Sequence, residues 1–106
     1  MINKKDKQVI VGIGYLIANN LYLKNNSAAT VTAIIENFKS IHIINDFIIK
    51  SIELDSYLYD AINHLCILIR LRPKAPLVEL SIDRVTSKPT LSNSEFTYKI
   101  SYKTLD

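Results

Sequence analysis

The chain has 106 residues, 48% of them apolar, and its 13 Lys and Arg against 10 Asp and Glu give a formal net charge of +3. This apolar fraction and small net charge exclude intrinsic disorder, and we expect one domain over residues 1–106 because the length is close to the commonest domain size. The single cysteine, Cys66, excludes an internal disulfide and fits a reducing compartment, so we expect a cytoplasmic protein.

The first predicted element is a helix over residues 4–23. Apolar residues recur there at helical spacing, namely Ile10, Ile13, Ile17 and Leu21. Gly12 and Gly14 each weaken a helix by roughly 1 kcal/mol relative to alanine, which suggests a close approach by another backbone or a start that is not helical. We expect this segment to form a buried N-terminal helix.

Lysines followed by the apolar run of residues 9–18 also have the outline of a signal peptide. Against that role, Leu16 stands where a small residue should precede a cut after Ala18. The run is also far shorter than the roughly 20 residues that span a bilayer. We therefore expect no membrane association.

A second helix is predicted from Ser27, a favourable N-cap, to about Ser40. Its apolar stripe comprises Val31, Ile34, Ile35 and Phe38. This spacing of three and four predicts one buried face.

The next two segments admit both helix and strand. Residues 42–54 fit a helix through Ile44, Ile48 and Ile52, although their β-branched side chains also suit a strand. Residues 55–72 fit a helix through Leu58, Ile62, Leu65 and Ile69. The end of this segment, residues 65–72, alternates in polarity and has a strand as its alternative; Pro73 ends either element.

Two C-terminal runs alternate apolar and polar residues, which predicts two half-buried strands. The first contains Val78, Leu80 and Ile82, the second contains Phe96, Tyr98, Ile100 and Tyr102, and turn-forming residues 87–94 separate them. Pairing Val78 with Tyr102 places Glu79 and Asp83 diagonally near Lys103 and Lys99. Because a lone hairpin is marginal in water, it must pack on helices, gain a strand from residues 65–72 or pair with another molecule.

These elements predict an α+β fold. Three or four N-terminal helices pack on a C-terminal antiparallel β-hairpin or on a small three-stranded sheet. The sequence shows no internal repeat, no flexible linker and no second domain.

The sequence gives little support for catalysis or for a cofactor. Gly12 and Gly14 follow an apolar run as in a dinucleotide-binding turn, but Ile17 stands where the third glycine should be. His64 and Cys66 diverge on a helix, and even on one strand face two ligands do not close a zinc site. The apolar surroundings of Cys66 disfavour a nucleophilic thiol. We expect no enzyme activity, no metal and no cofactor.

A winged-helix DNA-binding regulator is the alternative function, because three helices followed by a hairpin is the order of that fold. Lys88, Lys99 and Lys103 would then meet phosphates. A groove-reading helix should, however, expose several basic or amide side chains on one face, and none of the predicted helices does so.

Protein binding is the favoured class, since six tyrosines and no tryptophan stand in so small a chain and tyrosine offers a large contact area at low entropy cost. The hairpin also has an edge that could add to another sheet or form a homodimer. The predicted partner-binding residues are aromatic and basic: Tyr57, Tyr59, Arg70, Arg72, Lys74, Lys99 and Lys103.

We therefore expect a non-enzymatic inhibitor of bacterial or phage type, such as an immunity protein or antitoxin that blocks a toxin or effector. It would act by steric occlusion over an interface of about 800 Å² per partner. The basic cluster Arg70, Arg72 and Lys74 would meet an acidic surface, which disfavours a basic nuclease as the partner.

Overall fold

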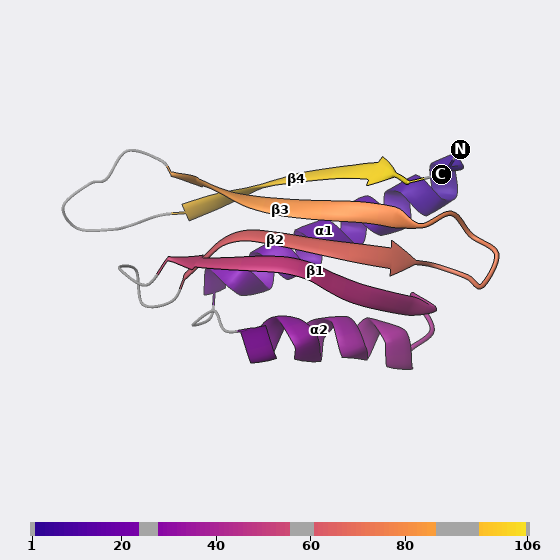
Figure 1. Ribbon diagram of the computed structural model, residues 1–106, viewed down its shortest axis with the longest axis horizontal. Coiled ribbons are helices and arrows are strands. Elements are labelled where there is room, and N and C mark those ends of the chain that lie inside the picture. Colours follow the sequence, from indigo (N-terminus) through magenta and orange to yellow (C-terminus); the bar gives the residue numbers. More distant parts are fainter. Residues whose placement is uncertain (1, 24–27, 56–60, 87–95, 106) are drawn as a thin grey trace.

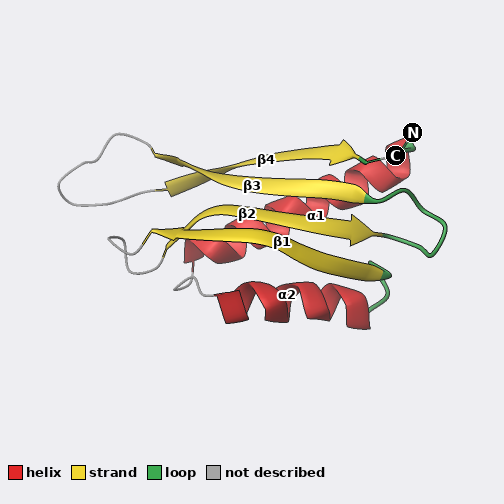
Figure 2. Ribbon diagram, in the orientation of Figure 1, coloured by secondary structure: helices red, strands yellow, loops and turns green. Residues whose placement is uncertain are grey.

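The computed structural model describes residues 2–23, 28–55, 61–86 and 96–105 (Figure 1). Two helices precede four strands in this part of the chain, and Figure 2 shows them by type. The elements are α1 (Lys4–Leu23), α2 (Ala28–Ser40), β1 (Asp46–Asp55), β2 (Ala61–Arg70), β3 (Val78–Thr86) and β4 (Phe96–Thr104). The strands form one antiparallel sheet in the order β1-β2-β3-β4. The fold is α+β, as the sequence predicts.

The first helix has the predicted bounds and buries the predicted stripe. Its N-terminus is capped by Asn3, whose Oδ1 accepts a hydrogen bond from the backbone N–H of Asp6 at 2.8 Å. The helix crosses behind the sheet in Figure 1 and packs on β3 and β4. Its four stripe residues are at most 3% exposed: Ile10, Ile13, Ile17 and Leu21.

The two glycines of α1 have different surroundings, and neither lies in a turn. A Cβ on Gly14 would lie 2.7 Å from Cγ2 of Ile100 and 3.3 Å from Cδ1 of Leu80, whereas a Cβ on Gly12 would meet nothing within 4 Å. Close approach is therefore required at Gly14 only. It is made by side chains of the sheet and not by a second backbone.

The second helix ends at a left-handed residue. His42 has φ 61°, and its N–H donates to the Lys39 carbonyl at 3.1 Å. The N–H of Ile43 donates to the Phe38 carbonyl at 3.0 Å. This pair of bonds is a Schellman motif, in which the left-handed position is more often glycine. It stops the helix and turns the chain toward the sheet.

The helix predicted over residues 42–54 is wrong, because β1 occupies residues 46–55. The pairing with β2 is irregular between Ile49 and Ser51, where Lys50 is the extra residue. Phe47, Ile49 and Ile52 consequently pack against the core from one side of the strand. Their spacing of two and then three interrupts the alternation of a strand. The helical spacing of Ile44, Ile48 and Ile52 does not mark one buried face, because Ile48 is 65% exposed on the other side of the sheet.

The helix predicted over residues 55–72 is also wrong in its described part, because β2 occupies residues 61–70. The strand that was the alternative for residues 65–72 is confirmed over residues 65–70. This strand lies between β1 and β3, and most of its side chains are buried. A strand buried on both faces is an almost continuous apolar run, which periodicity cannot distinguish from a buried helix. The sheet therefore has four strands where at most three were expected.

The predicted hairpin is confirmed, with a different register. Val78 pairs with Thr104, and Ile82 pairs with Ile100. The register differs by two residues from the predicted one, so every side chain keeps its predicted face. Glu79 and Asp83 consequently lie directly opposite Lys103 and Lys99 instead of diagonally.

The hydrophobic core lies between the sheet and the helices. The central strands contribute their fully buried side chains to it, namely Leu65, Ile67, Ile69, Val78, Leu80 and Ile82. α2 lies alongside β1 in Figure 1 and adds Val31, Ile35 and Phe38. The opposite side of the sheet, which we call the open face, carries Ile48, Ser51, His64, Cys66, Leu68, Glu79, Ser81, Asp83, Lys99, Ser101 and Lys103.

Candidate protein-binding edge

The β4 strand is one of the two outer strands of the sheet, and its pairing with β3 is regular over all nine residues from Phe96 to Thr104. The N–H of Leu105 donates to the Leu77 carbonyl at 3.0 Å. Backbone groups alternate in direction along an antiparallel strand. Lys99, Ser101 and Lys103 therefore direct their backbone groups toward β3, while Tyr98, Ile100 and Tyr102 direct theirs away from the sheet.

The β1 strand at the other edge is less regular. Its pairing with β2 is interrupted between Ile49 and Ser51 and again between Glu53 and Leu54. Bulges of this kind twist an edge and disrupt its row of hydrogen-bonding groups. α2 also packs against β1. The β4 edge is therefore the more suitable of the two for adding a strand.

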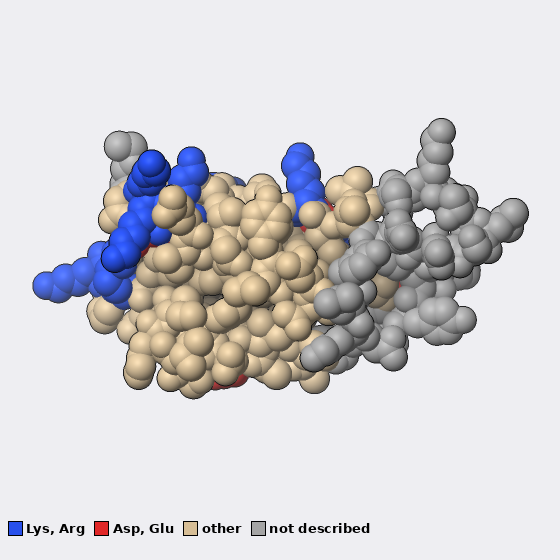
Figure 3. Space-filling view, turned by 180° about the vertical axis from the view of Figure 1, so that it is seen from behind, with Lys and Arg blue, Asp and Glu red and all other residues tan. Residues whose placement is uncertain are grey.

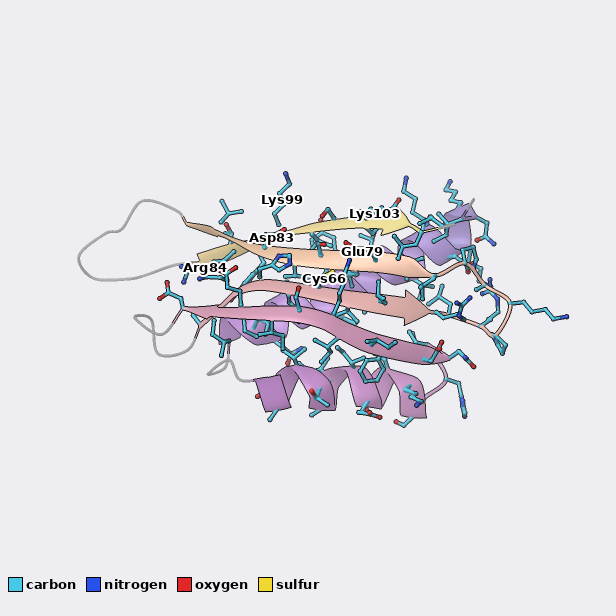
Figure 4. The ribbon with its side chains drawn as sticks, in the orientation of Figure 1. Cys66, Glu79, Asp83, Arg84, Lys99 and Lys103 are labelled. Carbon is cyan, nitrogen blue, oxygen red and sulfur yellow. The ribbon has the colours of Figure 1, made fainter. Side chains whose placement is uncertain are left out.

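Two of the predicted partner-binding cations, Lys99 and Lys103, lie on the open face of β4 (Figure 4). Both side chains are exposed. Nζ of Lys103 lies 3.9 Å from Oε1 of Glu79, and its side chain is 68% exposed. These two lysines border the β4 edge along which the backbone groups point outward.

Arg70 lies at the end of β2, Arg72 and Lys74 lie on the β2–β3 connection, and the two arginines have partners within the chain. Nη1 of Arg70 donates to the Ala75 carbonyl at 2.6 Å, which holds the β2–β3 connection. Nη1 and Nη2 of Arg72 donate to the two carboxylate oxygens of Asp6 at 3.0 and 2.6 Å, which ties this connection to α1. Lys74 is exposed on the same connection.

The ion pair with Arg72 determines the state of Asp6. This carboxylate is 6% exposed, and its hydrogen bonds from Arg72 lower its pKa below the ordinary value. The same contact raises the pKa of Arg72. The pair therefore serves the fold, because its carboxylate end is buried and held in a two-point contact.

Tyr57 and Tyr59 lie outside the described residues. Of the tyrosines that the structure describes on β4, Tyr98 and Tyr102 are half-buried against the core. The Tyr98 hydroxyl is buried without a hydrogen-bond partner among the described residues, and burial raises its pKa. Beside it across the hairpin, Arg84 donates from Nη2 to Asp55 at 2.8 Å.

The open face contains contacts that the sequence reasoning missed. Lys50 reaches from β1 across β2, and its Nζ lies 3.1 Å from Oε2 of Glu79 on β3. Hydrogen bonding to Lys50 lowers the pKa of Glu79. Nδ1 of His64 lies 2.5 Å from Oδ1 of Asp83, although a helical segment would have directed His64 toward Asp60. These contacts require strands in both segments that also fit helices, because Lys50 lies on β1 and His64 lies on β2.

Cys66 lies on the open face near Lys50 and Glu79 and is only 4% exposed. Burial raises the pKa of its thiol, and the hydroxyl of Ser81, 4.0 Å from Sγ, is its hydrogen-bonding neighbour. A protonated, covered thiol is a poor nucleophile. His64 and Cys66 do share a strand face, but no group of three potential metal ligands gathers among the described residues.

A shallow hollow of about 220 Å³ lies on the open face beside β4. It is lined by Glu79, Ser81, Ser101, Tyr102 and Lys103. Small-molecule sites occupy about 300 to 1,000 Å³ and enclose most of their ligand. This hollow is smaller and open, so it suits a side chain of a protein partner better than a cofactor.

The helix side of the molecule has a different character. Seen from behind in Figure 3, its centre is uncharged, and Lys and Arg side chains gather mainly at one end. Tyr15 and Leu16 of α1 are 59% and 51% exposed. No helix among the described residues is long and apolar enough to cross a bilayer.

Comparison with protein-family models, curated proteins and solved structures found no match to this chain.

Proposed function

We propose that the protein is a non-enzymatic binding module that adds a strand of a partner protein to its β4 edge. In doing so it covers a surface of the partner, as an inhibitor of the immunity-protein or antitoxin type would. An inhibitor that acts by steric occlusion needs no reactive side chain. The thiol of Cys66 is buried, so it is not presented to a partner, which is consistent with such a role.

The observation that carries this proposal is the regular outer edge of β4. Nine residues at about 3.4 Å each give an edge roughly 30 Å long. Along it, the backbone groups of Tyr98, Ile100 and Tyr102 point away from β3. Main-chain hydrogen bonds of this kind provide affinity when a peptide adds to a sheet, and alternate side chains provide specificity.

The DNA-binding alternative has less support. A winged helix reads DNA with a helix placed before the hairpin, and β1 and β2 stand where the third and fourth helices were expected. Lys88, one of the three lysines expected to meet phosphates, lies outside the described residues. We therefore prefer a protein as the partner.

The experiment compares Tyr102→Pro with Tyr102→Ala in affinity purification of the full chain at native levels. Proline removes the outward N–H of residue 102, and an outer strand tolerates it where that N–H faces solvent. Alanine removes the same aromatic side chain and keeps the N–H. We expect a stoichiometric protein partner with wild type and with Tyr102→Ala, and its loss with Tyr102→Pro.

Thermal unfolding of both variants verifies that they fold. Retention of the partner by folded Tyr102→Pro would contradict docking at β4. Loss of the partner with Tyr15→Ala on α1, while Tyr102→Pro retains it, would place the interface on the helix side. Recovery of nucleic acid alone, or of no partner, would refute the proposed function.

A further inference from the structure

We infer that the strand recognised by β4 carries acidic residues four positions apart on one face and apolar residues between them. This inference rests on the proposed function, because it specifies the chemistry of the segment that docks at the same edge. Three features support it: the only partly neutralised charge of the β4 lysines, the pairing pattern of β3 and the repulsion that opposes self-pairing.

The β4 lysines retain an excess of positive charge. Glu79 is shared between Lys50, whose Nζ lies 3.1 Å away, and Lys103, whose Nζ lies 3.9 Å away. Asp83, opposite Lys99, is in contact with His64 at 2.5 Å. No described residue forms an ion pair with Lys99. A new carboxylate beside each lysine would therefore meet a cation that its own sheet only partly neutralises.

The chain itself contains a strand with the complementary pattern. On its inner side, β4 pairs with the β3 sequence Glu79-Leu80-Ser81-Ile82-Asp83. The acidic residues stand opposite Lys103 and Lys99, and the apolar residues stand opposite Tyr102 and Ile100. Residues paired across an antiparallel ladder face the same side of the sheet. A second strand on the outer side of β4 meets the same two rows of side chains.

Pairing of two copies through β4 is disfavoured by charge. A two-fold antiparallel pairing that keeps side chains on matching faces must place odd-numbered residues opposite odd-numbered residues. The two-fold axis of such a pairing passes through one residue of β4. For an axis at any residue from 98 to 103, a lysine of one copy lies directly opposite or diagonal to a lysine of the other. Like charges so placed destabilise a ladder, and lysine on an edge strand is a common protection against self-association.

The test is fluorescence anisotropy with the full chain and two labelled synthetic peptides. One has the sequence of residues 78–83, VELSID, and the other has lysine in place of both acidic residues, VKLSIK. We expect the acidic peptide to bind more tightly. The double variant Lys99→Glu/Lys103→Glu should weaken binding of the acidic peptide roughly tenfold and strengthen that of the basic one.

Lys39→Glu is the control at another surface, because it makes the charge change of one of these two substitutions on the exposed last turn of α2, which packs beside β1. It should leave both affinities unchanged. Lys99→Gln/Lys103→Gln is the second variant, in case two new carboxylates opposite Asp83 and Glu79 unfold the hairpin. It should lose the preference for the acidic peptide without acquiring the opposite one.

Equal binding of both peptides, still blocked by Tyr102→Pro, would overturn the acidic pattern and leave strand addition intact. Binding of neither peptide would also overturn the inference, while the purification experiment decides the proposed function separately. Binding of a DNA duplex that depends on Lys99 and Lys103, without binding of the acidic peptide, would assign these lysines to phosphate contacts instead.

Discussion

The two faces of the sheet differ in what covers them. The face toward α1 is apolar, and its central side chains are shielded by the helices. The open face carries ion pairs between neighbouring or next-neighbouring strands, such as Lys50 with Glu79. This difference shows that one face stabilises the protein by burial, while polar contacts lie on the other. The proposed binding function uses the β4 border of the open face.

The largest expected effect is on the covered face. Leu65 is fully buried on β2, and Leu65→Ala should lower the free energy of unfolding by about 2–5 kcal/mol through lost burial and a cavity. Ile48→Ala, at a side chain 65% exposed on the open face, should change it by less than about 0.5 kcal/mol. Urea unfolding measures both, and similar losses would contradict the assignment of the two faces.

The second effect concerns how closely α1 lies on the sheet. A methyl group on Gly14 would contact Ile100 at 2.7 Å. The resulting overpacking costs about 1–3 kcal/mol, which should exceed the helix-propensity gain of about 1 kcal/mol. Gly14→Ala should therefore lower the midpoint of thermal unfolding. Gly12→Ala, with open space around it, should raise stability by about 0.5–1 kcal/mol; stabilisation by both would show that α1 can move away.

A smaller effect depends on pH. Arg72 lowers the pKa of Asp6 in the folded state below the ordinary value of about 4. The stabilisation is therefore complete above that value and is lost as the pH falls from about 4 toward the folded pKa. The stability difference between wild type and Asp6→Asn should be largest at neutral pH and shrink below pH 4. A stability difference that does not shrink below pH 4 would contradict this role of the ion pair.

The smallest effect is on the reactivity of the open face. Burial is the main cause of the raised pKa of Cys66, and the nearby Glu79 carboxylate raises it further. Glu79→Ala removes part of the cover and this negative charge, so an alkylating reagent should modify the thiol faster. Glu53→Ala, exposed on β1, is the control. An unchanged rate in the folded protein would show that the Lys50–Glu79 pair does not shield the thiol.

Regular elements could be predicted from the sequence, and irregular ones could not. The stripe of α1 and the alternation of β3 and β4 each repeat without interruption, so a single period identifies them. The predictions for β1 and β2 were wrong for different reasons. The extra residue at Lys50 breaks the alternation of β1. The central strand β2 has buried apolar side chains at most positions, so its sequence does not alternate clearly.

The candidate site was predictable only in part. Lys99 and Lys103 follow from the alternation of β4, which assigns them to one face whatever the register. Arg70 and Arg72 are adjacent to Lys74 in the sequence, but their partners, Ala75 and Asp6, are determined by folding. No local pattern predicts that Asp6 of α1 will contact Arg72 in the β2–β3 connection.

The sequence by itself determined the α+β class, the buried stripe of α1 and the facing of the hairpin, because each depends on the period of neighbouring residues. The tertiary structure alone decided that β1 and β2 are strands, that β4 is an outer strand and that Lys50 and Glu79 lie near Cys66. These features depend on contacts between distant segments. These contacts contribute to stability only when the whole sheet forms, so the pattern of neighbouring residues does not predict them.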